Sequence, residues 1–180
     1  YMAIVIRTPK EIAKMRRSGI ALRGVLDALP SSIAPGMTTM DLEKLAEAKI
    51  ADAGAIAAFK GYHDYPCVLC TSVNSEVVHG IPSAKRILRE GDVVSIDCGL
   101  IIDGYYSDSA ITLPVGKISA AAQSLLAATE RSLQAALDVV KPGATRGDVG
   151  AAVQEVAESA GFCDVREFVG HGIGTPMHEE

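Results

Sequence analysis

The segment from Asp97 to Asp108, Asp-Cys-Gly-Leu-Ile-Ile-Asp-Gly-Tyr-Tyr-Ser-Asp, carries the strongest fold signal in this sequence. The apolar run before it, Val93–Ile96, is typical of a buried strand. Within the segment, Asp103-Gly104 is a strong short-range signal for a hairpin, and the residues that follow predict a second strand, Tyr105–Leu113. We therefore expect two antiparallel strands joined by a tight turn.

Asp97 and Asp108 place two carboxylates on these strands, the first at the end of its strand and the second in the middle. Burying a carboxylate is costly unless it is paired, and two buried carboxylates repel each other unless a cation lies between them. The alternative is one structural aspartate in a turn and one exposed aspartate on an edge strand. We treat both residues as candidate metal ligands.

The composition describes a globular chain with a net negative charge. The 180 residues are 48% hydrophobic, which suits one domain with a large core. The net charge of −5 argues against a nucleic-acid binder, and no apolar stretch reaches the length of a membrane span. The N-terminus lacks a basic segment followed by an apolar core, so we expect no signal peptide and a cytoplasmic location.

Two local clusters have simple interpretations. Cys67 and Cys70 form a lone C-x-x-C in a strand-like run, without the second pair or the spaced histidines of a zinc site, so we expect reduced thiols. A basic group near the start of the chain is either the solvated face of a helix or a docking patch, and we favour the first. Its members are Lys10, Lys14, Arg16, Arg17 and Arg23.

Capping residues, prolines and glycines outline the remaining elements. Thr8 to Glu11 has the pattern of a capping box with proline at the first helical position, and this helix is expected to end at Pro30. The other expected elements are a helix from about Thr39 to Gly54, a strand-like segment to Phe59, a strand Cys67–Val73, a helix Ser119–Val140, a turn at Pro142-Gly143 followed by a helix to Gly161, and a strand-like segment Asp164–Val169.

The chain also contains a half-repeat. Residues 35–42 and 142–149 match at their Pro, Gly, Thr and Asp positions with an offset of 107, and Ala53-Gly54 falls on Ala160-Gly161 at the same offset. A shared turn, cap and helix end indicate a structural duplication. We expect one catalytic domain over residues 1–180, with a first half of about 8–113 and a second half of about 117–180 that lacks its last strands.

The four histidines, His63, His79, His171 and His178, are further candidates for chemistry, although a lone histidine is more often an ordinary polar residue. His79 precedes Gly80, whereas His171 has glycine on both sides, which lets a metal or substrate come close. His178 follows His171 in the same glycine-rich segment. Two aspartates and a histidine without a thiolate suit Mn²⁺, Fe²⁺, Co²⁺ or Zn²⁺, and bridging carboxylates suit a pair of metals that generates hydroxide near neutral pH.

Taken together, the motifs resemble those of type I methionine aminopeptidases over nearly the whole chain. That family has the pita-bread fold, an α+β architecture of two pseudo-symmetric halves around a central site, which agrees with the half-repeat. The segments that carry the resemblance are Gly61-Tyr62-His63, Tyr65-Pro66, Cys70–Asn74, Val77–Pro82, Gly91–Asp97, Asp103–Asp108, Val140–Gly143, Gly161-Phe162 and Gly170–Gly174 through His178-Glu179-Glu180.

The resemblance implies a metal-dependent hydrolase that removes the N-terminal initiator methionine by attack of a metal-bridged hydroxide. Asp97 would bind one of two metals in bidentate fashion, Asp108 would bridge both, and His171 would bind the second. The remaining ligands are glutamates from C-terminal strands that these residues do not include, so we expect an incomplete metal site and little activity from the 180 residues alone. His79 would stabilise the transition state and contact the scissile amide nitrogen, and His178 would hydrogen-bond the substrate carbonyl oxygen.

The resemblance also implies an apolar pocket for the methionine side chain. Positions 59 and 177 are often cysteine and phenylalanine in the family, so the substitutions here keep the pocket apolar but change its shape. The expected walls are Phe59, Tyr62, Tyr65, Cys70 and Met177.

Two alternatives stay open. A related Xaa-Pro peptidase shares the fold but carries a large N-terminal domain that is not seen here. A non-catalytic pita-bread protein that binds a protein partner would not need two aspartates and three histidines together. The expected partners are the N-terminal methionine of peptides and nascent proteins, with the ribosome as a further candidate, no specific nucleic acid and no membrane, and a monomer is expected.

Overall fold

The computed structural model of the chain describes residues 4–179, so Glu180, the last residue of the expected motif, lies outside the described part. The chain divides into two compact units. The first comprises residues 4–117 and 171–179, and the second comprises residues 118–170. The last segment therefore packs with the first unit, although the sequence placed it in the second half.

The first unit is built on an antiparallel sheet whose central strand is β3 (Val93–Ile102). One edge of β3 pairs over its whole length with β4 (Tyr105–Pro114), and the other edge pairs first with β2 (Leu69–Val73) and then with the short β1 (Ile56–Ala57). The mixture of this sheet with helices confirms the α+β class.

The β3–β4 hairpin confirms the strongest prediction from the sequence. Asp103 and Gly104 both have positive φ, 53° and 78°, as a two-residue type I′ turn requires. However, β3 continues beyond Asp97 to Ile102, so the expectation that Asp97 ends its strand is wrong. The ladder with β4 is unbroken on both sides of Gly99, and Asp97 lies in the middle of the strand.

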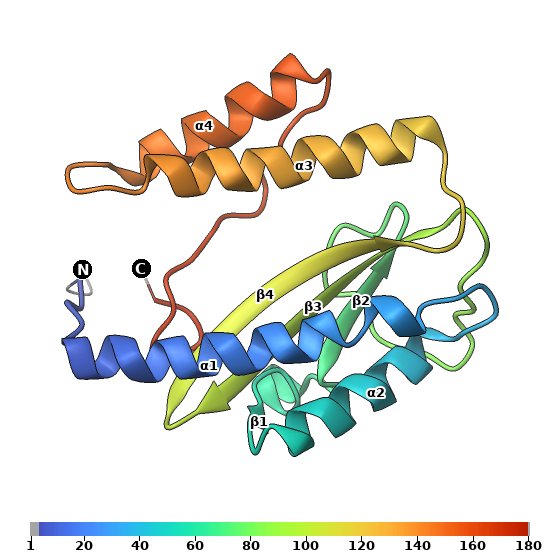
Figure 1. Cartoon of the computed structure of the whole chain (residues 1–180), viewed down its shortest axis with the longest axis horizontal. Coiled ribbons are helices and arrows are strands. Elements are labelled where there is room, and N and C mark those ends of the chain that lie inside the picture. Colours follow the sequence, from blue (N-terminus) through green and yellow to red (C-terminus); the bar gives the residue numbers. More distant parts are fainter. Residues whose placement is uncertain (1–3, 180) are drawn as a thin grey trace. The chain divides into compact units, whose positions relative to one another are not determined.

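Side chains alternate between the two faces of the sheet, and one face forms the core. Val94, Ile96, Cys98 and Leu100 of β3 are all 0% exposed. Helix α1 (Pro9–Asp27) packs against β3 and β4, and α2 (Thr39–Asp52) packs against β1 and β2 (Figure 1). Each buried aliphatic side chain of this size contributes roughly 1.5–3 kcal/mol to stability. The helices therefore fix which face of β3 remains available for a site.

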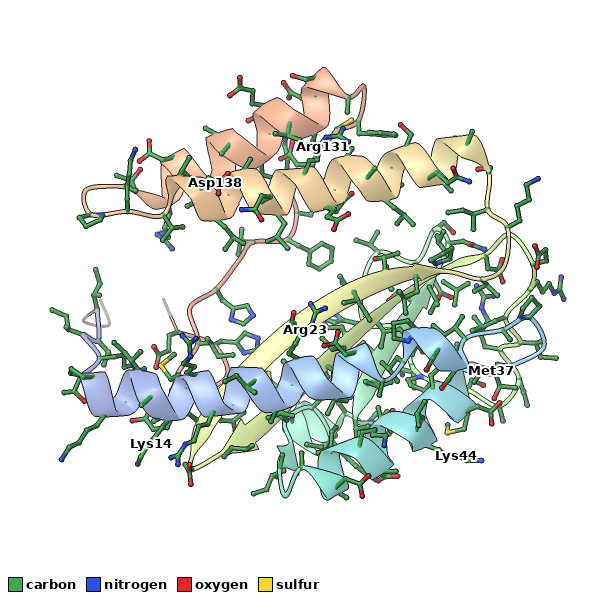
Figure 2. The ribbon with its side chains drawn as sticks, in the orientation of Figure 1. Lys14, Arg23, Met37, Lys44, Arg131 and Asp138 are labelled. Atoms are coloured by element: carbon green, nitrogen blue, oxygen red, sulfur yellow. The ribbon has the colours of Figure 1, made fainter. Side chains whose placement is uncertain are left out.

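The basic residues of α1 face solvent, as both a solvated helix face and a docking patch require. All five side chains are exposed, and Lys14 and Arg23 come from different turns of the helix (Figure 2). Arg23 pairs with Asp27 at 2.7 Å, and the Lys14 ammonium lies 5.6 Å from the centre of the Tyr105 ring. None of the helices in residues 4–179 is both long and apolar enough to cross a membrane.

The half-repeat is present in the structure as two helices that start and end at the same offset. In the second unit α3 (Ala120–Val139) packs against α4 (Arg146–Ser159), whose bounds match those of α2. Both α2 and α4 begin with a complete capping box, from Thr38 with Asp41 and from Thr145 with Asp148. The turns before them also match, because Gly36 and Gly143 have φ of 95° and 92°.

The strand expected at residues 164–169 does not form, and this prediction is wrong. The segment has no regular secondary structure. In the first unit, the corresponding segment after α2 becomes β1 only because it pairs with β3 at Ile101 and Leu100. No strand is present among the described residues 118–170 to provide such a partner, and a lone extended segment has no ladder of hydrogen bonds to hold it.

Candidate active site

Asp97 and Asp108 share the face of the sheet that α1 and α2 do not cover. In the β3–β4 register Asp97 is opposite Ala110 and Asp108 is opposite Gly99, so the two carboxylates are diagonal neighbours on one face. Burial, followed by the negative charge of Asp108, raises the pKa of Asp97 to about 7. Two carboxylates in this position are destabilised as a pair of anions, which is the electrostatic property of a cation site.

His171 approaches these carboxylates on a loop that is tied to β4. The Tyr106 N–H donates to the Gly174 carbonyl at 2.8 Å, and Gly172 and Glu179 exchange two backbone hydrogen bonds of 2.8 Å. The Nε2 atom of His171 lies 3.8 Å from a carboxylate oxygen of Asp108. Backbone hydrogen bonds to the sheet therefore place the imidazole beside Asp108.

The tautomer of the neutral His171 ring follows from the hydrogen bond of its Nδ1 atom. Nδ1 lies 2.9 Å from the Gly172 carbonyl oxygen, which can only accept a hydrogen bond. In the neutral imidazole Nδ1 therefore carries the proton, and Nε2 presents a lone pair on the side of Asp108. This is the tautomer in which metal-binding histidines are commonly held.

His178 stands between His171 and Tyr62. The rings of His171 and His178 meet edge to face with centroids 4.4 Å apart, and the Tyr62 hydroxyl lies 3.0 Å from Nδ1 of His178. Tyr62 was expected as a wall of the apolar pocket, but its side chain is 37% exposed and its hydroxyl contacts a histidine. The structure thus gives it a polar contact that the sequence did not indicate.

The remaining expected wall residues come together in one apolar cluster. Phe59, Cys70 and Met177 are each at most 8% exposed, and Tyr65 packs against them. Cys70 is opposite Asp97 in the β2–β3 register, so the cluster adjoins the carboxylates on the same face. The sequence did not identify three other members of the cluster, Ala58, Ile101 and Tyr106.

Gly99 makes room for this cluster. A Cβ atom at position 99 would lie 2.6 Å from Cε1 of Phe59 and 3.1 Å from Cβ of Ala58. The Phe59 ring therefore rests directly on the backbone of β3, between the positions of Asp97 and Ile101. The glycine is required by this close approach, since its φ is not positive.

Tyr65 and Cys70 are held as neutral groups. The Tyr65 hydroxyl donates to the Leu69 carbonyl at 2.8 Å, and burial raises its pKa. Burial also raises the pKa of the Cys70 thiol to about 11, with a further contribution from the charges of Asp97 and Asp108. A neutral thiol and phenol suit an apolar wall, whereas a thiolate ligand or nucleophile would need a lowered pKa.

His79 lies on the loop beside β2. Its side chain is exposed and its φ is 62°, an uncommon value for a residue other than glycine. The next residue, Gly80, accepts a hydrogen bond of 2.7 Å from the Thr71 N–H, and a Cβ atom there would lie 2.2 Å from the Thr71 carbonyl oxygen. The backbone around His79 is therefore fixed against β2, and its role in catalysis stays a prediction.

The expected ligands do not form a complete metal-binding group on their own. Within residues 4–179, no set of three or more His, Cys, Asp or Glu side chains is arranged to hold a metal ion. What the structure brings together is the pair Asp97 and Asp108, with His171 beside the second. Their chemistry fits divalent metal ions, because all three are hard or borderline donors and the carboxylates repel each other.

Comparison with known proteins shows the family of the chain. The model of metallopeptidase family M24 matches residues 13–180. The chain is 44% identical over 177 residues to a methionine aminopeptidase of Clostridium acetobutylicum, and the match covers 98% of the chain and 71% of the relative. Methionine aminopeptidase 1 of Bacillus subtilis is 43% identical with the same coverage.

Solved structures give the same result for the fold. The methionine aminopeptidase of Rickettsia prowazekii matches with a TM-score of 0.96 and 37% identity, over 99% of this chain and 71% of that one. A prolidase of Pyrococcus furiosus matches with a TM-score of 0.84 at 23% identity, which shows a shared fold only. The chain therefore belongs to metallopeptidase family M24 and has the pita-bread fold, with an incomplete second half. Within that family, the relatives of high identity are methionine aminopeptidases, metal-dependent hydrolases.

Proposed function

We propose that this chain forms the principal part of an aminopeptidase site that releases the N-terminal methionine of peptides and nascent proteins with two divalent metal ions. The proposal rests on one observation: the carboxylates of Asp97 and Asp108 and the apolar cluster lie on the same face of the sheet. A peptide whose first side chain enters the apolar cluster would have its first peptide bond beside Asp97 and Asp108.

The proposed metal ligands from this chain are Asp97, Asp108 and His171. The metals are drawn from Fe²⁺, Mn²⁺, Co²⁺ and Zn²⁺, all of which accept carboxylate and imidazole ligands. When bound, such ions lower the pKa of water and polarise a peptide carbonyl. The pKa of Asp97, raised first by burial and then by the charge of Asp108, supports the proposal, since a cation between the carboxylates would offset both effects.

Tyr62 and His178 would act on the substrate carbonyl. If the Tyr62 hydroxyl donates to Nδ1 of His178, the proton of the neutral ring is on Nε2, which can then donate to the carbonyl oxygen. A donor placed in advance at a developing negative charge is typically worth about 3 kcal/mol. His79 would stabilise the transition state and contact the scissile amide nitrogen, with Gly80 fixing its backbone on β2.

The proposed specificity comes from the cluster of Phe59, Cys70 and Met177 with Tyr65 at its side. It offers a thioether, a neutral thiol and aromatic rings, which suit the flexible, polarisable side chain of methionine. A charged first side chain would be desolvated there without a partner, which is costly. Rejection of charged residues is therefore expected.

The cellular setting follows from the proposed substrate. We propose a monomer in the cytoplasm that meets nascent chains at the ribosome. The exposed cations of α1 support contact with a polyanion, but two of them already pair with Asp27 and Asp103. We therefore expect such contact to be weak and strongly dependent on salt.

Methionine release from Met-Gly-Met tests the function, with Glu-Gly-Met as the matched peptide. After chelator treatment, each metal is added back singly, and calorimetry measures its binding to wild type, Asp97→Asn and the exposed control Asp52→Asn. In a protein that includes the C-terminal strands with the remaining ligands, we expect release only from the methionine peptide and only with metal, and a selective loss of metal binding in Asp97→Asn. From residues 1–180 alone we expect little release. Metal-independent release, or unchanged metal binding by Asp97→Asn, would contradict the proposal.

A further inference from the structure

Glu43 is a buried carboxylate that the site described above does not use. It lies on α2 and is 5% exposed. One of its oxygens accepts a hydrogen bond of 2.7 Å from the Val68 N–H, and the other accepts one of 2.9 Å from the Leu69 N–H. Burial raises the pKa of Glu43, and these two donors act in the opposite direction. The carboxylate thus meets two backbone groups that would otherwise be buried without a partner.

These two amides lie where the chain enters β2, next to the groups that form the site. The Leu69 carbonyl accepts the Tyr65 hydroxyl at 2.8 Å, and Cys70 is the next residue. One side of β2 pairs with β3, where Cys70 is opposite Asp97. On the other side of β2, the Thr71 N–H donates a hydrogen bond to the Gly80 carbonyl. The position of the start of β2 therefore sets the positions of Tyr65 and Cys70 in the apolar cluster.

We infer that Glu43 is a positioning residue for substrate binding, which holds the start of β2 so that Tyr65 and Cys70 keep their places in the apolar cluster. This inference rests on the proposed function, because the cluster must receive the substrate side chain. Glu43 acts from the opposite, helix-covered side of the sheet and does not touch the substrate.

The geometry requires a carboxylate and not an amide. Two adjacent N–H donors need two acceptor oxygens, and the glutamine side chain supplies one oxygen and one NH₂ group. In Glu43→Gln one backbone N–H therefore faces another donor, and the start of β2 must shift. The proposed metal ligands lie on β3, β4 and the loop after residue 170. A shift at the start of β2 should therefore leave the affinity for metal unchanged.

The test compares Glu43→Gln with Glu47→Gln in the metal-loaded enzyme that includes the C-terminal strands. Glu47 lies one turn further along α2, where its exposed side chain pairs with Lys60 at 2.6 Å, so it is a matched control. We expect Glu43→Gln to raise KM for Met-Gly-Met about tenfold, with kcat within about twofold of wild type. Amide hydrogen exchange at Val68 and Leu69 should accelerate, and the affinity for the metal alone should not change. Glu47→Gln should match wild type throughout.

Two further readouts separate this inference from the proposed function. Equilibrium binding of free methionine is measured by NMR. A wild-type protein that binds methionine but shows no turnover would refute the proposed hydrolysis. The effect of Glu43 on methionine binding could still be measured in that case. If Glu43→Gln does not fold, Glu43→Asp keeps the charge but is one methylene shorter, and should show the same rise in KM. Three outcomes would overturn the inference. The first is a variant in which kcat and metal affinity fall as much as KM rises, the second is unchanged methionine binding in the variant, and the third is failure of both variants to fold.

Discussion

Gly99→Ala should damage substrate binding and stability without touching a proposed ligand. The new Cβ atom would lie 2.6 Å from Cε1 of Phe59 and 3.1 Å from its Cδ1. Real Cβ atoms do not approach so closely, so the ring must move into the apolar cluster of Cys70 and Met177. Overpacking of a filled site costs about 1–3 kcal/mol, and we expect the free energy of unfolding to fall by that amount.

Urea unfolding and steady-state kinetics measure the two effects of Gly99→Ala. The urea concentration at the midpoint of unfolding should decrease. If about 1.4 kcal/mol of the packing cost weakens substrate binding in the cluster, KM for Met-Gly-Met should rise about tenfold. Gly24→Ala is the control, since a Cβ atom there meets nothing within 4 Å and alanine stabilises a helix interior by roughly 0.5–1 kcal/mol. A Gly99→Ala protein with wild-type stability and KM would refute the packing argument.

Three other predictions address the histidines and a helix cap. Tyr62→Phe removes the hydrogen bond to His178 and should lower kcat about three- to tenfold, as steady-state kinetics would show; an unchanged kcat would mean that the bond does not orient the ring. His79→Ala should lower kcat by about a hundredfold or more with metal affinity retained, and near-normal turnover would remove His79 from the mechanism. Thr145→Ala should cost about 1 kcal/mol near neutral pH, measured by urea unfolding at several pH values. Hydrogen bonds from the Thr145 N–H and then from its hydroxyl lower the pKa of Asp148, and Thr145→Ala removes only the second. The stability that the hydroxyl adds through Asp148 is present above the ordinary pKa of Asp148 and is lost as pH falls through the lowered value. The difference between Thr145→Ala and wild type should therefore shrink at low pH, and a constant difference would contradict this linkage.

The sequence predicted the parts of the fold whose causes are local. Asp103-Gly104 specifies its turn by backbone conformation alone, and the capping box at Thr8 specifies a helix start. The strand expected at residues 164–169 failed because a strand depends on a partner elsewhere in the chain. The end of β3 was misplaced because Asp97 was treated as a polar stop, although a half-buried strand alternates polar and apolar residues.

The site was predictable to the extent that its residues form motifs. Asp97, Asp108 and His171 stand out because their residue types are uncommon in apolar or glycine-rich surroundings. Ile101 and Tyr106 were missed because nothing in their type distinguishes them from core residues. Counting in twos along each strand from the aspartates would have found both, since they share the aspartates' face. The contact of Tyr62 with His178 joins segments 116 residues apart and has no local signal.

The alternation of β3 and β4 links correct folding to a working site. A slip of one residue in one strand's alignment would turn its aspartate towards α1 and its aliphatic side chains towards water. Such a molecule would lose the packing of Leu100 and Ile96, which are 0% exposed, together with its proposed metal ligand. Molecules with a scrambled site are therefore also unstable ones, and a stably folded but inactive population should not accumulate. For the same reason, single-residue insertions or deletions within this hairpin should be among the least tolerated changes in the chain.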